Sequence, residues 1–287
     1  MPEHLQIDPA AFAASFTREP FVVGHSLASH PLLQVERLLE LCQALPPASV
    51  EYNAGDIPKA LKNEDTPMNG LTAEETIRRI GECQSWLVMK HVEQDAAYRR
   101  LLDECLDQVQ PLAESVAPGM TQRQAFIFVT SPGSTTPYHI DPEHNFLLQI
   151  RGDKHVTMFD GRDRSILGET DLEQMYMDVG RNLPFDEAWE AGAWKFTLKP
   201  GQGLHFPVTY PHYVQNGEEV SISLSITFRT PDLDRRRELY RRNASLRAAG
   251  KQPRPVGQSP LLDQVAFQTL RVKRKAKSLV ASRRSEQ

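Results

Sequence analysis

The chain has 287 residues, 40% of them hydrophobic, and a formal net charge of −4. This length and composition suit one or two globular domains with a substantial core. There is no run of about 18 apolar residues, which argues against a membrane span, and the first residues do not resemble a secretory signal. Three cysteines, far apart and outside any CxxC pattern, argue against a disulfide framework or structural zinc. They favour a reducing, cytoplasmic location.

The charge is unevenly distributed along the chain. Residues 231–287 hold 15 Lys/Arg against 5 Asp/Glu, whereas residues 1–230 hold 18 against 32. A basic tail raises the question of a nucleic-acid or acidic partner. No helix-turn-helix pattern accompanies this tail, and Lys/Arg-rich helices are more often solvated or dimer-forming than DNA-binding. The sequence therefore gives nucleic-acid binding no further support.

Residues 1–120 are predicted to form a mixed helical region that supports the rest of the chain. Helices are expected after Asp8, over residues 31–45, after the capping box Thr72–Glu75, and over residues 94–116. Strands are expected at residues 21–24 and 86–89, and residues 49–70 are expected to be irregular. None of these segments carries a catalytic signature.

Residues 121–230 change to a period of two, with many aromatic and β-branched residues. Strands are expected at 125–130, 145–150, 154–159, 196–198 and 220–228, with 145–150 and 154–159 forming a hairpin. Residues 160–195 are a long polar insertion with weak periodicity, and we expect it to shape a substrate mouth. Short strands without intervening helices indicate an antiparallel barrel or jelly roll. Residues 231–287 are predicted to be helical again.

The segment Thr136-Pro-Tyr-His139-Ile-Asp141 carries a histidine and an aspartate two residues apart. On an extended strand these side chains point to the same face, so both can reach one metal ion. His212 lies about 70 residues further on and is the candidate third ligand. Two histidines and one carboxylate, with coordination positions left open, are the ligand set of non-haem Fe(II) oxygenases. Alone, the short pattern is more often a hydrogen-bonded loop pair.

The second half of the pattern is more specific. Gly201, Pro207, Thr209, His212 and Asn216 have the spacing of the second cupin signature, in which glycine normally stands where Thr209 is. Residues 124–228 resemble the cupin-like jumonji-C class of Fe(II)/2-oxoglutarate oxygenases and are most similar to its asparaginyl-hydroxylase branch. That resemblance rests on three features: the motif Thr-Pro-x-His-x-Asp quoted above, an Asn six residues after the histidine, and the segment Gln149-Ile-Arg-Gly-Asp-Lys154.

The resemblance implies roles for several residues. His139, Asp141 and His212 would bind Fe(II). Lys154 would pair with the distal carboxylate of 2-oxoglutarate, and Thr136 and Asn145 would hydrogen-bond to this cosubstrate. A buried lysine needs an anionic partner, although by residue type alone an exposed turn lysine is commoner.

Other residues near the site leave alternatives open. Arg229 on the last strand is a rival anchor for the cosubstrate, and Lys154 is preferred. The last-strand asparagine of the family is absent, and Ser225 or Thr227 would supply a hydroxyl in its place. Three further histidines are assigned as follows: a weak ligand candidate (His144), one pointing away from Lys154 (His155), and one in the core or substrate pocket (His205).

We therefore expect an α+β protein whose all-β core is a double-stranded β-helix, or cupin jelly roll, flanked by N-terminal and C-terminal helices. Its regions would be a support region (1–120), a catalytic core (121–230) and a basic helical extension (231–287) that the resemblance links to homodimer formation. The expected activity is hydroxylation of an unidentified protein, RNA or small molecule, using dioxygen and 2-oxoglutarate. The alternatives are a metal-binding cupin that does not use 2-oxoglutarate and a non-enzymatic regulator.

Overall fold

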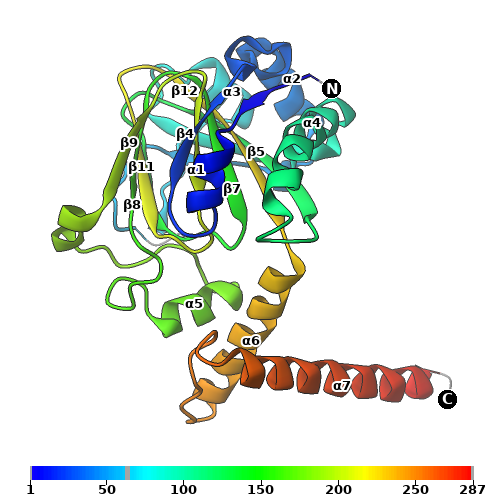
Figure 1. Ribbon diagram of the computed structural model, residues 1–287. Coiled ribbons are helices and arrows are strands. Elements are labelled where there is room, and N and C mark those ends of the chain that lie inside the picture. Colours follow the sequence, from blue (N-terminus) through cyan, green and yellow to red (C-terminus); the bar gives the residue numbers. More distant parts are fainter. Residues whose placement is uncertain (1, 62–64, 286–287) are drawn as a thin grey trace.

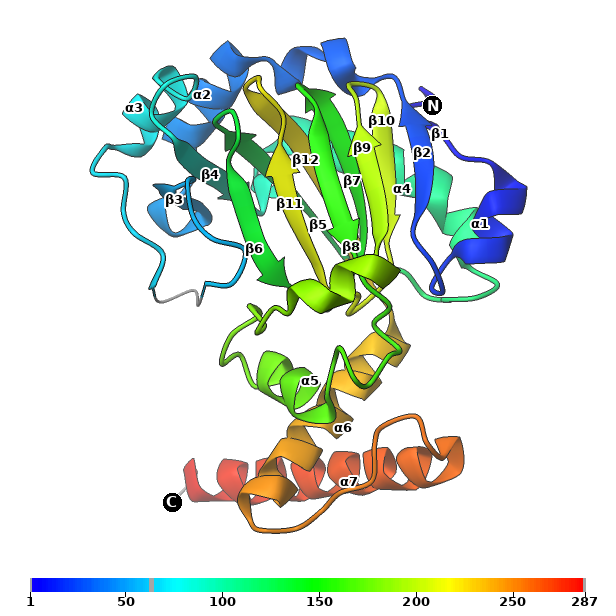
Figure 2. The same ribbon diagram turned by 90° about the vertical axis from the view of Figure 1, so that its left-hand side faces the viewer.

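The computed structural model describes residues 2–61 and 65–285, without the side chains of residues 276–285. Twelve labelled strands form two antiparallel sheets that face each other (Figures 1 and 2). In spatial order the larger sheet contains β1 (Leu5–Gln6), β2 (Phe21–His25), β10 (Gln202–Phe206), β7 (His144–Arg151), β12 (Ser221–Arg229), β5 (Thr121–Thr130), β4 (Ser85–Lys90) and β3 (Val50–Ala54). The smaller sheet contains β6 (Thr135–His139), β11 (His212–Asn216), β8 (Lys154–Met158) and β9 (Trp194–Leu198).

This arrangement confirms the expected jelly roll with flanking helices. Helices before the core strands are α1 (Pro9–Ser15), α2 (Val35–Ala44), α3 (Ala73–Arg78) and α4 (Ala96–Ala113). The later helices are α5 (Glu169–Tyr176), α6 (Pro231–Ala248) and α7 (Pro260–Ser285). Short 3-10 helices lie at Leu27–Ser29, Pro31–Leu33, Pro47–Ser49, Val92–Gln94 and Glu187–Gly192. The caps predicted at Asp8 and Thr72 are both formed.

The core has two main layers. Strand alternation places Ile127 and Val129 of β5 against the helices, where they pack with α2 and α4 residues such as Leu38 and Leu102. The opposite face of the large sheet faces the small one, and a second cluster that includes Leu147, Val156, Met158, Phe206 and Val214 fills part of the space between them. The remaining space between the sheets is a cavity.

Three details differ from the expectations. The predicted hairpin is wrong, because β7 lies in the large sheet, whereas β8 pairs with β11 and β9 in the small one. The backbone passes from one sheet to the other at Gly152, whose φ of +69° and close approach to the Val220 carbonyl leave no room for a Cβ atom. Residues 49–70 contain the edge strand β3, and the insertion 160–195 contains α5, so helical structure does interrupt the strands.

The C-terminal helices leave the body of the molecule. Helix α6 runs away from the two sheets, and α7 crosses its far end (Figures 1 and 2). Helix α5 packs on α6 through the stacked rings of Tyr176 and Tyr240, with centroids 5.2 Å apart. Within the described residues, no helix combines the length and hydropathy needed to cross a membrane.

Candidate metal and cosubstrate site

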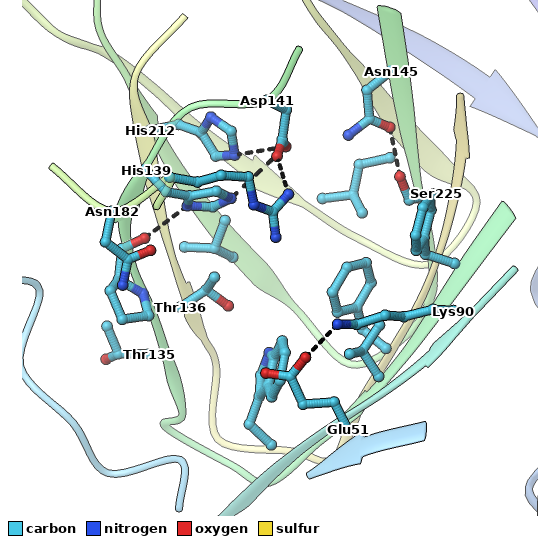
Figure 3. Close-up of a pocket in the computed structure, with 18 of the residues that line it drawn as sticks. Glu51, Lys90, Thr135, Thr136, His139, Asp141, Asn145, Asn182, His212 and Ser225 are labelled. Carbon is cyan, nitrogen blue, oxygen red and sulfur yellow. Dashed lines mark hydrogen bonds and ion pairs between the residues drawn. The ribbon is translucent and has the colours of Figure 1, made fainter. Parts of the chain in front are cut away.

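Two histidines from neighbouring strands meet beside an aspartate. His139 is the last residue of β6 and His212 is the first residue of β11, and the two pair directly across the ladder. Asp141 follows β6 by two residues, and its Oδ2 lies 3.7 Å from the Nε2 atom of each histidine. The donor atoms of all three lie within 4.8 Å of one another, so one metal ion can contact them together (Figure 3).

The backbone fixes the orientation of both imidazoles. The Nδ1 atoms of His139 and His212 lie 2.7 and 2.9 Å from the carbonyl oxygens of Pro137 and Tyr210. A carbonyl can only accept, so each Nδ1 carries the proton and each Nε2 presents its lone pair toward Asp141. This tautomer is the one required of a metal ligand.

The electrostatics of this group also suit a cation. Burial and the neighbouring imidazole lower the pKa of His212 to about 3, and burial lowers the pKa of His139. Burial would raise the pKa of Asp141, but Arg181 and the two histidines hold it at about 2. Near neutral pH the group therefore consists of two neutral imidazoles and one carboxylate, which is the protonation state that binds metal.

Arg181 was not predicted from the sequence. It lies in the insertion between α5 and β9, and its Nη1 donates to Oδ1 of Asp141 at 2.6 Å. The amide of Ile140 donates to the Arg181 carbonyl, which holds this part of the insertion beside the candidate metal ligands. Arg181 thus occupies one carboxylate oxygen and leaves Oδ2 facing the histidines. Arg181 and Asp141 are 40 residues apart in the sequence, so no local pattern predicted their contact.

The three residues line a cavity of about 490 Å³ between the sheets, which lies in the size range of small-molecule sites. The four residues expected to bind the cosubstrate, Thr136, Asn145, Lys154 and Thr227, line the same cavity. Ser225 on β12 donates to the Asn145 side-chain oxygen at 2.7 Å. The cavity therefore brings together the three expected metal ligands and the four residues expected to bind the cosubstrate.

Lys154 is the unusual member of this group. It opens β8, and period-two alternation gives it the same inward direction as Val156 and Met158. Only 4% of the residue is exposed, and its ammonium group makes no ion pair or hydrogen bond with any residue that the structure describes. Burial lowers its pKa to about 7. A lysine buried without a partner is costly, so its surroundings point to an anionic ligand.

The rival anchor Arg229 is in a different situation. Its guanidinium contacts Glu143 at 3.4 Å and Asp234 at 3.1 Å, and the residue does not line the cavity. Two carboxylates already balance its charge, so the geometry favours Lys154 as the group available to a dianion.

The other three histidines named from the sequence lie apart from the candidate metal ligands. His205 is fully buried among Phe16, Phe21 and Phe146, which makes it a core residue. His144 stacks on Phe228 and is not part of the metal-binding group found among the described residues. His155 is exposed, on the face of β8 opposite Lys154.

The jelly roll and this arrangement of residues define the class of protein. Residues 38–234 match the model of the cupin-like domain family, and the protein belongs to that family. Among curated proteins it is 31% identical over 102 residues to lysine-specific demethylase JMJ30 of Arabidopsis thaliana. This match covers 33% of this protein and 23% of the relative. Lysine-specific demethylase 8 of Xenopus tropicalis is 31% identical over 104 residues, covering 33% and 22%. The matched region thus spans about a quarter of the length of these relatives.

Solved structures share the fold over most of the protein. The ribosomal oxygenase YcfD of Escherichia coli superposes with a TM-score of 0.51 at 16% identity, over 95% of this protein and 68% of that one. A structure of YcfD in complex with cobalt and 2-oxoglutarate also has a TM-score of 0.51, at 15% identity, over 94% and 67%. At this level of identity the similarity shows a shared fold, and the chemistry of this protein has to be inferred from its own residues.

Proposed function

We propose that the protein is an Fe(II)- and 2-oxoglutarate-dependent oxygenase that hydroxylates its substrate. The observation that carries this proposal is Lys154, a buried cation with no partner among the described residues, in the same cavity as two histidines and an aspartate. The structure of YcfD with cobalt and 2-oxoglutarate supports it by analogy of fold.

The donor set fits Fe(II). His139, Asp141 and His212 would hold the ion from one side, which leaves the cavity side open to other ligands. The carbonyls of Pro137 and Tyr210 and the guanidinium of Arg181 hold the three side chains before any metal arrives. When bound, the iron would supply the redox chemistry through which dioxygen oxidises the keto acid and the substrate. The protein itself supplies position and charge.

The cosubstrate would lie between the metal residues and β8. The ammonium of Lys154 would pair with its distal carboxylate, and the side chains of Thr136, Asn145 and Thr227 offer hydrogen bonds along the way. The side-chain oxygen of Asn145 already accepts a hydrogen bond from Ser225, so the side-chain N–H groups of Asn145 are available to donate to the cosubstrate. Burial of these groups between the sheets would exclude water from the reacting atoms.

Succinate formation tests the proposal. The protein, incubated with Fe(II), ascorbate, dioxygen and 2-oxoglutarate, should release succinate and carbon dioxide even without substrate, at a slow uncoupled rate. Changing His139 to alanine should abolish this release. Equal succinate formation by both proteins, or metal-dependent activity that does not consume 2-oxoglutarate, would contradict the proposal.

We also propose that the C-terminal helices bind a second copy of the protein. Helix α7 exposes Leu261, Leu262, Val265 and Val272, with exposed fractions between 53% and 74%. Apolar side chains gathered on a protruding helix are typical of association surfaces. Light scattering should show a dimer, and Leu262→Glu combined with Val265→Glu should convert it to a monomer. A wild-type monomer at high concentration would contradict this assignment.

A further inference from the structure

Part of the inner face of the large sheet is left uncovered beside the metal residues. Among the described residues the small sheet has four strands and the large one has eight. Strands β3 and β4, which follow β5 at the edge of the large sheet, extend beyond β6 (Figure 2). The side chains of Glu51, Trp86, Lys90, Phe126 and Phe128 on these three strands line the cavity. Figure 3 shows Glu51 and Lys90 across the cavity from His139, Asp141 and His212. None of these five residues has a role in binding the metal or the cosubstrate.

Glu51 and Lys90 form an ion pair on neighbouring strands. Glu51 lies opposite Val88 in the β3–β4 ladder, so Lys90 is its diagonal neighbour. The two side chains are 45% and 34% exposed. Exposed pairs contribute only about 0–1 kcal/mol, so a ligand that offers both partners replaces the pair at little cost.

The remaining charges around the cavity are already matched. Arg181 pairs with Asp141, and Glu143 pairs with Arg229. On the proposed function, which this inference rests on, Lys154 is assigned to the keto acid. The surface left for the substrate is therefore one acid beside one base, with no net charge. A ligand with one unbalanced charge would cover both side chains and leave either Glu51 or Lys90 buried without a partner, which is costly.

The wall next to this pair is aromatic. Phe126 lies opposite Lys90 in the β4–β5 ladder, and Phe128 lies opposite Val88. Both rings and that of Trp86 are only partly buried. An apolar group laid against these rings would remove their surface from water, at about 25 cal/mol for each Å².

We infer that the substrate is a free amino acid with an apolar side chain. Its carboxylate would bind Lys90, its ammonium group would bind Glu51, and its apolar part would lie along Phe126, Phe128 and Trp86 toward the metal residues. The cavity volume of about 490 Å³ lies within the range of sites that bind small molecules. That leaves room for the keto acid and one such amino acid together. In the reaction one oxygen atom of dioxygen is inserted into a C–H bond of the apolar group, the other enters succinate, and carbon dioxide leaves.

Binding to the protein loaded with Mn(II) and 2-oxoglutarate, without dioxygen, tests this inference. We expect L-phenylalanine or L-leucine to bind measurably by calorimetry. We expect 3-phenylpropionate, 2-phenylethylamine and N-acetyl-L-phenylalanine amide, each lacking one or both charges, to bind at least tenfold more weakly than L-phenylalanine. The variants Glu51→Gln and Lys90→Met should each weaken amino-acid binding by a similar factor while 2-oxoglutarate binding stays unchanged. Glu74→Gln, which breaks the surface pair with Arg78, is the matched control.

Three outcomes would overturn the inference. The first is binding of the acetylated amide as tight as that of free phenylalanine, which indicates a peptide substrate. The second is retention of 2-oxoglutarate binding while no apolar amino acid binds. The third is equal amino-acid affinity in Glu51→Gln and Glu74→Gln. If the wild-type protein does not bind 2-oxoglutarate, the proposed function is refuted, and so is this inference, which rests on it.

Discussion

Replacing Lys154 with methionine should stabilise the ligand-free protein and remove its affinity for 2-oxoglutarate. Methionine keeps an unbranched side chain of similar length, so the packing beside Val156 is retained. What disappears is an ammonium group on a residue that is 4% exposed and has no partner among the described residues. A residue whose role is to bind a ligand should show this pattern, in which its replacement stabilises the ligand-free protein and weakens ligand binding.

The size of the gain follows from the pKa of Lys154. Burial lowers it from 10.5 to about 7, a difference of about 3.5 pKa units at 1.36 kcal/mol each, so the cost of the buried charge has a ceiling of about 5 kcal/mol. Because the folded-state pKa lies below the unfolded-state value, the cost is fully present below pH 7 and fades as pH rises toward 10.5. Relaxation and water in the cavity reduce it, so about 2–4 kcal/mol is expected at pH 7.

Thermal unfolding measures this effect. A gain of this size should raise the melting temperature by roughly 3–7 °C at pH 7, and less at pH 9. Lys199→Met, at an exposed position, is the matched control and should change stability by about 0.5 kcal/mol or less. Calorimetry with 2-oxoglutarate should show binding to the control but not to Lys154→Met. The reasoning is refuted if Lys154→Met is less stable than wild type and still binds the keto acid.

Three further predictions concern neighbouring groups. In metal-loaded protein the Kd for 2-oxoglutarate should rise above pH 7, approaching tenfold per pH unit, because the protonated form of Lys154 binds the cosubstrate. Calorimetry in two buffers should detect proton uptake on binding. The variant Lys154→Arg should make the Kd less dependent on pH. Arg181→Met should weaken Mn(II) binding about tenfold in a chelator competition, because it removes the donor to Asp141; unchanged affinity would show that this contact does not position the ligand. Thr209→Gly should raise the free energy of unfolding in urea by about 1 kcal/mol, because Thr209 has a φ of +61°; a loss of stability would contradict the strain.

The sequence predicted the features that depend on nearby residues. The capping box at Thr72 and the spacing of His139 and Asp141 are local patterns, and both appear in the structure as expected. Lys154 does lie in the cavity, although the hairpin in which it was expected did not form. Lys154 faces the cavity from the small sheet, through its pairing with β11, and not from a hairpin with β7.

Features that depend on contacts between distant segments were missed. The turn at Gly152 has the composition of a hairpin turn, but the backbone passes between sheets there, which only the packing of all twelve strands decides. Strand β3 lies at the sheet edge and carries Glu51 and Asn53 among its few residues, so its alternation was too weak to recognise. Arg181 belongs to an insertion with no periodic pattern, and its role depends entirely on contact with Asp141.

The central claim is that three metal residues and one lysine ammonium hold a single cosubstrate between them. NMR relaxation of 2-oxoglutarate in the presence of protein loaded with paramagnetic Mn(II) tests it most directly. We predict strong broadening of the cosubstrate resonances with wild type, and none with His139→Ala or with Lys154→Met carrying bound metal. Equal broadening with Lys154→Met, or sharp resonances while wild type holds the metal, would contradict the claim.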